Sequence, residues 1–331
     1  MRNKTFIFLT PCFRLRSLVS ESAFHEESCP KPLFTFSLAP GLATVFVVDQ
    51  LGIDEIRGAV QAALAEDIGS GDVTTLAIVP ENAIAQAMMR ARESLIVAGL
   101  ALAEAAFREL SSDLRLVRRV EDGQRAESGT VLLEIQGSAR PILSAERVAL
   151  NFVQRLSGVA TLTAQFVEAV KGTKTQILDT RKTTPGWRRL EKYAAACGGG
   201  QNHRFGLFDM VLIKDNHLAA LKTESPNAIA AALQRARTKY PQLKIEVEAD
   251  TLEEVQQAVA AGAELILLDN MNPVQLRLAV QKCQGRAQTE ASGGVTLASV
   301  RAIAETGVDF ISVGALTHSA RAVDIGLDFE L

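Results

Sequence analysis

Apolar residues recur at helical spacing from Gly52 to Glu66, which predicts a helix that ends in a glycine- and acid-rich turn at residues 66–74. Strand-like stretches and one further helix follow, separated by short turns. The strands are expected at 83–91, 94–98, 113–120 and 130–136, and the helix at 100–110. This order predicts a small α+β domain over residues 50–155.

A long amphipathic pattern runs from Ala145 to Lys171, with Val148, Phe152 and Leu156 on its apolar stripe. It predicts a helix that links the small domain to the rest of the chain.

The remainder of the chain, residues 156–331, alternates short apolar strands with amphipathic helices. Strands are expected at 176–179, 210–214, 244–248, 265–269, 287–291 and 310–313, and helices at 187–197, 227–240, 252–261, 273–283 and 297–305. Repeated βα units imply a parallel sheet covered by helices, and charge at the strand ends favours a barrel. With about six to seven strands the α/β barrel would be incomplete, and a C-terminal tail is left over that can return to the small domain.

Residues 1–49 differ in kind, since they hold seven of the 14 Phe and no acidic residue among the first twenty. A targeting leader and an upstream start codon that is not the true one explain this equally well. In either case we expect the extension to be poorly ordered.

Composition narrows the class of protein. The 331 residues are 47% hydrophobic and 22% charged, which is enough to bury a full core. No apolar run approaches the roughly 18 residues of a membrane span. A net charge of -3 argues against a general nucleic-acid binder. The partner is therefore expected to be a small molecule.

The four cysteines are far apart and predict neither a disulfide framework nor a zinc site, which fits a reducing cytoplasm. Cys197 has no base beside it in sequence, so a buried apolar filler is favoured over a thiolate nucleophile.

Positive charge is concentrated between Asp179 and His217, in DTRKTTPGWRRLEKYAAACGGGQNHRFGLFDMVLIKDNH. Dense cations at the ends of apolar strands suit a small polyanion, which they hold by charge-assisted hydrogen bonds. The cations are Arg181, Lys182, Arg188, Arg189, Lys192, Arg204 and Lys214. We interpret this stretch as an anionic-substrate site.

Two carboxylates are predicted to meet at the same rim. Alternation along 244–248 directs Lys244, Glu246 and Glu248 into the barrel, and Asp269 ends the next strand. Glu248 and Asp269 would suit one Mg²⁺ bound mostly through water and substrate phosphate. A grip on ribose hydroxyls, or a structural ion pair with an inward Lys or Arg, remains possible.

The last two units end in glycine-rich loops, Ser292-Gly293-Gly294 and Gly314-Ala315-Leu316. Exposed backbone N–H groups after the final barrel strands are a common phosphate site. Each loop alone is also compatible with a plain turn.

Four motifs occur at compatible spacing: ERVALNF-x-x-x-LSG-x-AT, DTRKTTPG, GGG-x-NHR and LIKDNH. Together they resemble the quinolinate phosphoribosyltransferase family, whose activity is that of a carboxylating nicotinate-nucleotide pyrophosphorylase. The resemblance runs from about Leu51 to the C-terminus. It implies an incomplete barrel, and a transfer from phosphoribosyl pyrophosphate to quinolinate with loss of CO₂. It also implies Mg²⁺ and a homodimer or higher oligomer in which Arg147 enters the neighbouring subunit's site.

The resemblance assigns roles to individual residues. The quinolinate carboxylates would contact Arg147, Arg181, His203, Arg204 and Lys214, and the pyrophosphate region Lys182 and Lys214. The ribose phosphate would contact Glu248, Asp269, Ser292, Gly293, Gly294, Ser312 and Gly314, with Thr180 and Thr183 as hydroxyl donors. Lys182, Lys214, Glu248 and Asp269 are the expected catalytic groups.

Several of these residues also have a purely structural interpretation. Arg147 taken alone could be a solvated surface arginine, and His203 could be a core histidine. His217 either lines the site or packs against the rest of the domain. Trp187 is expected to pack.

Three other functions also remain. A related phosphoribosyltransferase acting on nicotinate would need fewer cations. Lys214 at a strand end would suit a Schiff-base lyase. A binding protein without turnover would keep the cations but gain nothing from two carboxylates beside a polyanion.

Overall fold

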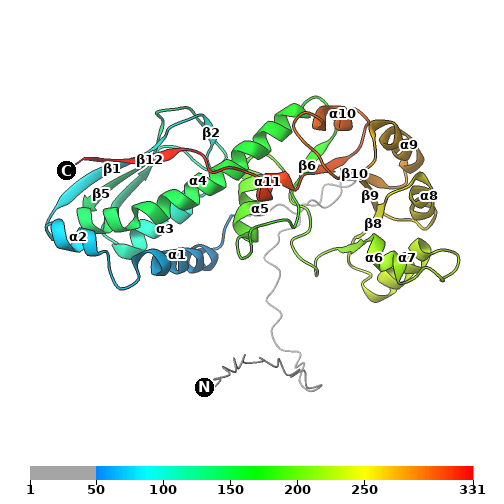
Figure 1. The fold of residues 1–331 in the computed structure, drawn as a ribbon, viewed down its shortest axis with the longest axis horizontal. Coiled ribbons are helices and arrows are strands. Elements are labelled where there is room, and N and C mark those ends of the chain that lie inside the picture. The colour runs from blue at the N-terminus through cyan, green and yellow to red at the C-terminus, as the bar shows by residue number, and fades with distance from the viewer. Residues whose placement is uncertain (1–49, 331) are drawn as a thin grey trace, which may run out of the picture. The chain divides into compact units, whose positions relative to one another are not determined.

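A computed structural model describes residues 50–330 of the chain (Figure 1). The expectations for residues 1–49 lie outside the described residues. No helix in the described range is both long enough and apolar enough to cross a membrane.

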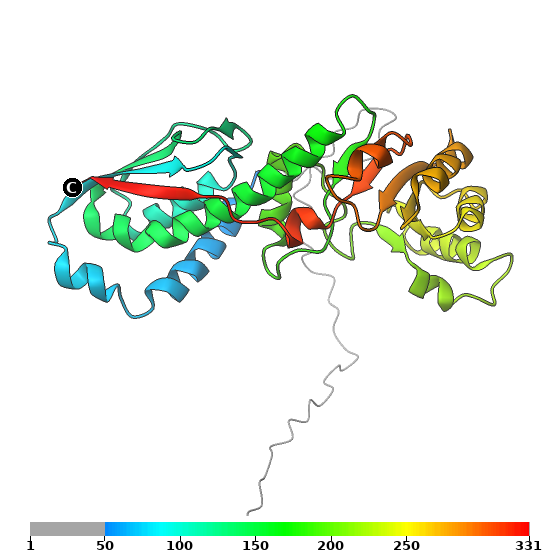
Figure 2. The ribbon, with the colours of Figure 1, turned by 45° about the horizontal axis from the view of Figure 1, so that its top comes forward.

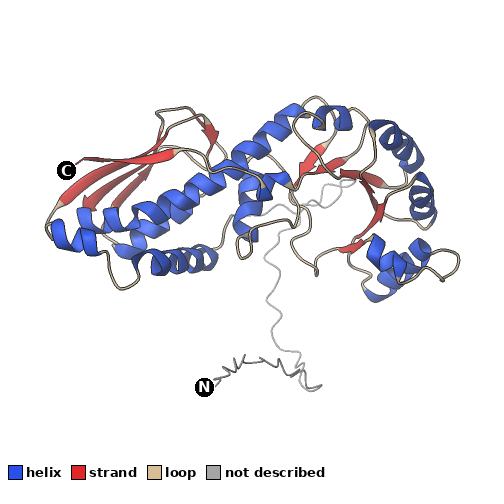
Figure 3. Ribbon diagram, in the orientation of Figure 1, coloured by secondary structure: helices blue, strands red, loops and turns tan. Residues whose placement is uncertain are grey.

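The small domain is a four-stranded antiparallel sheet with helices packed on it (Figure 3). Its strand order is β12-β1-β5-β3, so the end of the chain pairs with the first strand (Figure 2). The elements are α1 (Ile53–Ile68), α2 (Val73–Ile78), β1 (Ile84–Ala91), β2 (Leu95–Ile96), α3 (Leu100–Leu110), β3 (Arg115–Arg118), β4 (Arg125–Ala126), β5 (Val131–Ser138), α4 (Ala139–Ala169) and β12 (Ile325–Glu330).

Strand β4 was not predicted from the sequence, and helices α2 and α4 differ from their predicted bounds. Helix α2 begins within the predicted turn, because Asp72 caps it by accepting the N–H of Thr75 and also accepts from the Ser144 hydroxyl. Helix α4 begins at Ala139 instead of Ala145. Pro141 lies in its first turn, where a missing N–H costs no helical hydrogen bond.

The second domain is an open parallel barrel with sheet order β6-β11-β10-β9-β8-β7. Gln201 forms a parallel bridge to Leu178 beside β6, and no ladder joins β6 to β7 in the described part of the chain. The elements are β6 (Gln176–Leu178), α5 (Arg188–Cys197), β7 (Val211–Ile213), α6 (Asp215–Ala219), α7 (Ala228–Lys239), β8 (Ile245–Ala249), α8 (Leu252–Ala260), β9 (Leu265–Asp269), α9 (Pro273–Cys283), β10 (Gln288–Ser292), α10 (Val300–Ala304), β11 (Phe310–Ser312) and α11 (Ala315–His318). The predicted fold class, an incomplete α/β barrel plus a small α+β domain, is confirmed.

The parallel register brings the carboxyl ends of the barrel strands to one edge. Asp269 pairs with Ser292, and Ser312 pairs with Leu178. Residues at or just after these strand ends therefore face a common space.

Helix α4 connects the two domains because it contributes to both hydrophobic cores (Figure 1). Phe152 packs in the small-domain core and Phe166 in the barrel core. Between them lies Gly158, where a Cβ would stand 1.9 Å from the backbone oxygen of Arg321. Only glycine lets the segment that leads into β12 cross α4 this closely.

Candidate active site

A cavity of about 630 Å³ lies at the carboxyl ends of the barrel strands. Most site residues predicted from the sequence line it, and Arg147 and Thr183 do not. The predicted residues that line it are Thr180, Arg181, Lys182, His203, Arg204, Lys214, Glu248, Asp269, Ser292, Gly293, Gly294, Ser312 and Gly314. The strand-end argument therefore placed these residues around one cavity, while the role of each residue stays a prediction.

Arg147 is exposed on α4 and does not line this cavity. A role for Arg147 at the active site thus requires another copy of the chain, and that prediction stays untested.

Two guanidinium groups crowd one side of the cavity. Arg204 is only 7% exposed, and its Nη1 donates to the Met210 carbonyl at 3.2 Å. Burial and the neighbouring Arg181 lower the pKa of Arg204. The Arg181 Nε is buried and has no hydrogen-bond partner among the described residues. An anion placed between the two groups would relieve both conditions.

Lys214 and Glu248, at the ends of neighbouring strands β7 and β8, form a short ion pair through Nζ and Oε2. The structural alternative for Glu248, a lysine partner, is thus present in this structure. The same pair occupies the ammonium that a Schiff-base lyase would need as a free amine. Asp269 accepts from the Asn270 side chain at 2.6 Å.

His203 lies against two fully buried glutamates. Its Nε2 is 3.1 Å from Glu246 Oε2 and 3.4 Å from Glu290 Oε2. Its Nδ1 accepts the backbone N–H of Arg204 at 2.8 Å, so we infer that Nε2 carries the proton. Burial and Glu290 together raise the pKa of Glu246 to about 7.

These three side chains are close enough to hold a metal ion. The tautomer of His203 argues against one there, because a protonated Nε2 has no lone pair to offer. His203 is therefore neither free nor a plain core histidine, since it lines the cavity with its ring held on both sides.

The glycine loops have the backbone that the phosphate interpretation requires. Gly293 has a φ of +97°, and a Cβ there would lie 2.1 Å from Asn270 Oδ1. Gly314 lies beside Lys182, whose Cδ would be 2.9 Å from an added Cβ. A side chain is thus excluded at Gly293, whereas at Gly314 an added Cβ would displace the flexible Lys182 side chain, which places a cation beside that loop.

Comparison with known proteins settles the family. Residues 72–157 match the N-terminal domain model of quinolinate phosphoribosyl transferase, and residues 159–328 match its C-terminal domain model. The chain belongs to the quinolinate phosphoribosyl transferase family. The predicted resemblance is confirmed.

Relatives in the quinolinate phosphoribosyl transferase family align with most of this chain. A nicotinate-nucleotide pyrophosphorylase [carboxylating] of Mycobacterium leprae is 47% identical over 83% of this chain and 97% of its own length. A chloroplastic protein of that name from Arabidopsis thaliana is 42% identical over 83% of each chain. The solved nicotinate-nucleotide pyrophosphorylase from Francisella tularensis superposes with a TM-score of 0.82 at 38% identity, and covers 87% of this chain and 100% of its own.

Some cavity residues of this transferase were not predicted from the sequence. Glu290 was missed, although the alternation along QTEAS directs it inward like Glu246. His318 on α11 also lines the cavity, and its Nδ1 lies 2.7 Å from the Ser319 hydroxyl. A histidine placed shortly after a glycine loop was the signal available for it.

Other candidates do not line the cavity. His217 accepts the N–H of Lys214 at 2.9 Å, and Thr183 accepts from Arg188 Nε at 3.1 Å. Trp187 stacks on Phe152, with ring centroids 5.2 Å apart, as expected. Burial raises the pKa of the Cys197 thiol to about 12, which favours the filler interpretation.

Proposed function

We propose that this chain transfers the phosphoribosyl group of phosphoribosyl pyrophosphate to quinolinate and releases one carboxylate as CO₂. The products are nicotinate mononucleotide and pyrophosphate, as in NAD biosynthesis. The family membership supports the proposal, and so do relatives named as carboxylating pyrophosphorylases or decarboxylating quinolinate phosphoribosyltransferases.

The observation that carries the proposal is a group of cations without carboxylate partners. Within residues 50–330, Arg181, Lys182 and Arg204 line the cavity and form no ion pair with an acid. Lys192 and Lys214, by contrast, each bind a carboxylate. Two open guanidiniums match the two carboxylates of quinolinate, whereas nicotinate carries one. Phosphoribosyl transfer to nicotinate is the second candidate.

The charges suit the bond-breaking step. When pyrophosphate leaves the anomeric carbon, positive charge develops on the ribose, and Glu248 and Asp269 would offset it. Lys182 and Lys214 would offset the negative charge of the departing pyrophosphate. The quinolinate nitrogen forms the new bond to the anomeric carbon.

Decarboxylation follows from the charge of the new pyridinium. The electrons of the bond to the ring 2-carboxylate stay on the ring as CO₂ leaves, and a proton from solvent takes the vacated position. Arg181, His203 and Arg204 would orient the carboxylates during this step. No covalent bond to the protein is needed.

We propose Mg²⁺ as the metal, held indirectly by Glu248 and Asp269. Two carboxylates on neighbouring strands β8 and β9 are the hard oxygen donors that this ion prefers, and too few for a closed protein cage. When bound, Mg²⁺ would add positive charge at the leaving group.

We also propose a homodimer or higher oligomer in which Arg147 enters a neighbouring cavity. Mixing an Arg147→Met variant with a Lys214→Met variant, each inactive alone, should restore activity in the hybrid, which then contains one intact site. Continued inactivity of hybrids verified by mass spectrometry would oppose the exchange.

A cytoplasmic location fits the scattered cysteines. Because some plant relatives are named as chloroplastic or mitochondrial, microscopy of the chain with and without residues 1–49 tests it.

One assay tests the reaction. Quinolinate labelled in its 2-carboxylate should release CO₂ only with both phosphoribosyl pyrophosphate and Mg²⁺ present, with one nicotinate mononucleotide per CO₂. Absence of release would overturn the proposal. Formation of the same nucleotide from nicotinate would favour the second candidate, and trapping of a substrate on Lys214 by borohydride would favour a lyase.

A further inference from the structure

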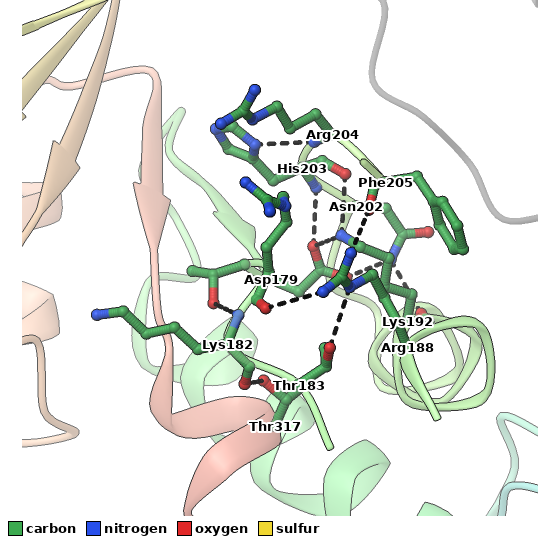
Figure 4. Close-up of polar contacts among 12 residues, drawn as sticks. Asp179, Lys182, Thr183, Arg188, Lys192, Asn202, His203, Arg204, Phe205 and Thr317 are labelled. Atoms are coloured by element: carbon green, nitrogen blue, oxygen red, sulfur yellow. Dashed lines mark hydrogen bonds and ion pairs between the residues drawn. The ribbon is translucent and has the colours of Figure 1, made fainter. Parts of the chain in front are cut away.

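A buried polar group beneath the cavity has no part in the reaction as described so far. We call Asp179, Lys192 and Asn202 the Asp179 clamp (Figure 4). Asp179 follows β6, Lys192 lies in α5, and Asn202 follows the glycine triplet. Asp179 and Lys192 are fully buried, and Asn202 is nearly so.

The clamp is closed by hydrogen bonds in several directions. Lys192 Nζ donates to Asp179 Oδ1 at 2.5 Å, and Asn202 Nδ2 donates to Asp179 Oδ2 at 2.7 Å. The same Asn202 nitrogen donates to the Lys192 carbonyl at 2.9 Å. Three segments that are distant in sequence are thereby joined through one carboxylate.

The clamp also binds both polar groups of the His203 backbone. Its N–H donates to Asp179 Oδ1 at 2.9 Å, and its carbonyl accepts from Lys192 Nζ at 2.9 Å. The next residue, Arg204, donates its N–H to the His203 ring. The directions in which His203 and Arg204 leave the backbone therefore depend on the clamp.

Arg181 and Lys182 lie close to the same carboxylate in the sequence. Asp179 directly precedes residues 180–182, which carry Arg181 and Lys182. The same buried residue thus directly precedes segment 180–182 and is hydrogen-bonded to segment 203–204, and both segments line the cavity.

Stability alone gives little reason for such a group. Burial raises the pKa of Asp179 and lowers the pKa of Lys192, so desolvation opposes the charged pair. A buried ion pair can often be replaced by well-packed apolar residues without loss of stability. Geometry at His203, in contrast, depends on an acceptor for its N–H.

We propose that Asp179 and Lys192 are positioning residues, which set the affinity for the dicarboxylate by holding His203 and Arg204 in place. The inference rests on the proposed function. It assigns the clamp to quinolinate binding and leaves the grip on the sugar phosphate to the glycine loops.

Two uncharged double variants separate positioning from stability. D179L/K192M removes the charges and the acceptor for the His203 N–H, whereas D179N/K192M removes the charges and keeps an acceptor oxygen. D179L/K192M should melt at a lower temperature than D179N/K192M, because it leaves the His203 N–H and the Asn202 side chain without the Asp179 acceptor. In D179L/K192M the KM for quinolinate should rise at least about tenfold, with the KM for phosphoribosyl pyrophosphate within about twofold of wild type. In D179N/K192M most of the quinolinate affinity should return.

Two further variants complete the design. F107L, a core change in the small domain, should lower the melting temperature without altering the quinolinate KM. If D179L/K192M does not fold, N202A takes its place. This variant removes two clamp hydrogen bonds and keeps the Asp179–Lys192 ion pair. The KM of N202A for quinolinate should rise, and its KM for phosphoribosyl pyrophosphate should stay unchanged.

The outcomes separate the two proposals. A wild-type enzyme without CO₂ release overturns the proposed function. If the wild type is active, two results overturn the clamp alone. The first is an unchanged quinolinate KM in D179L/K192M, or in N202A where that variant replaces it. The second is an equal rise of KM for both substrates.

Discussion

Replacing Arg204 by Met should weaken quinolinate binding and spare the fold. The side chain has similar length, and the lost guanidinium has no acidic partner among the described residues. A hydrogen bond to a charged group contributes about 1.5–3 kcal/mol. At about 1.4 kcal/mol per tenfold, the dissociation constant of quinolinate should rise about 10- to 150-fold.

The same variant should lose its stabilisation by substrate. Quinolinate at about 100 times its dissociation constant stabilises the folded enzyme by about 2.7 kcal/mol. After a 100-fold loss of affinity the same concentration would give only about 0.4 kcal/mol. The free enzyme should change little, because the loss of the bond to the Met210 carbonyl is offset by relief of the crowding with Arg181.

Calorimetric titration and thermal melts with and without quinolinate measure both effects. Arg235→Met is the matched control, since Arg235 pairs with Glu224 and does not line the cavity. Wild-type affinity and a full thermal shift in Arg204→Met would refute the assignment of Arg204 to the anion.

Three further predictions concern the rest of the fold. Gly158→Ala should lower stability by about 1–3 kcal/mol or more, measured by urea unfolding, because its Cβ would overlap the Arg321 carbonyl; an unchanged midpoint would contradict the close crossing. The hydrogen bond and charge of Arg321 lower the pKa of Glu93 to about 2, so this acid stabilises the fold above its usual pKa of 4.5, and that contribution disappears as the pH falls from 4.5 towards 2. Glu93→Gln should flatten melting temperature against pH in this window, and an unchanged profile would exclude the pair. Cys197 should react with iodoacetamide far more slowly than an exposed thiol at pH 8, as mass spectrometry of its peptide would show, since its pKa is raised to about 12; rapid labelling would disprove its burial.

Several barrel strands were predictable because they are short apolar runs bounded by turns. The predicted strand at 265–269 coincides with β9. The first turn of α4 was not predictable from periodicity, since Pro141 resembles a helix breaker until its position within the first turn is known. The residue that caps helix α2, Asp72, accepts a hydrogen bond from Ser144, and Ser144 is distant from α2 in the sequence.

The same distinction between local and distant partners explains the site. Strand-end position is a local property, and it was sufficient to place Lys214, Glu248 and Asp269 in one cavity. Pairing is a property of the folded chain, and the sequence left open whether Glu248 faces an ion or a lysine. Asp179 and Lys192 read as one more acid and one more cation in a basic stretch, although burial makes them a pair that no substrate reaches. Counting cations therefore overstates the charge available to a ligand, since only Arg181, Lys182 and Arg204 of that stretch line the cavity without an acidic partner among the described residues. Those three cations are what a doubly charged pyridine and a pyrophosphate would have to share.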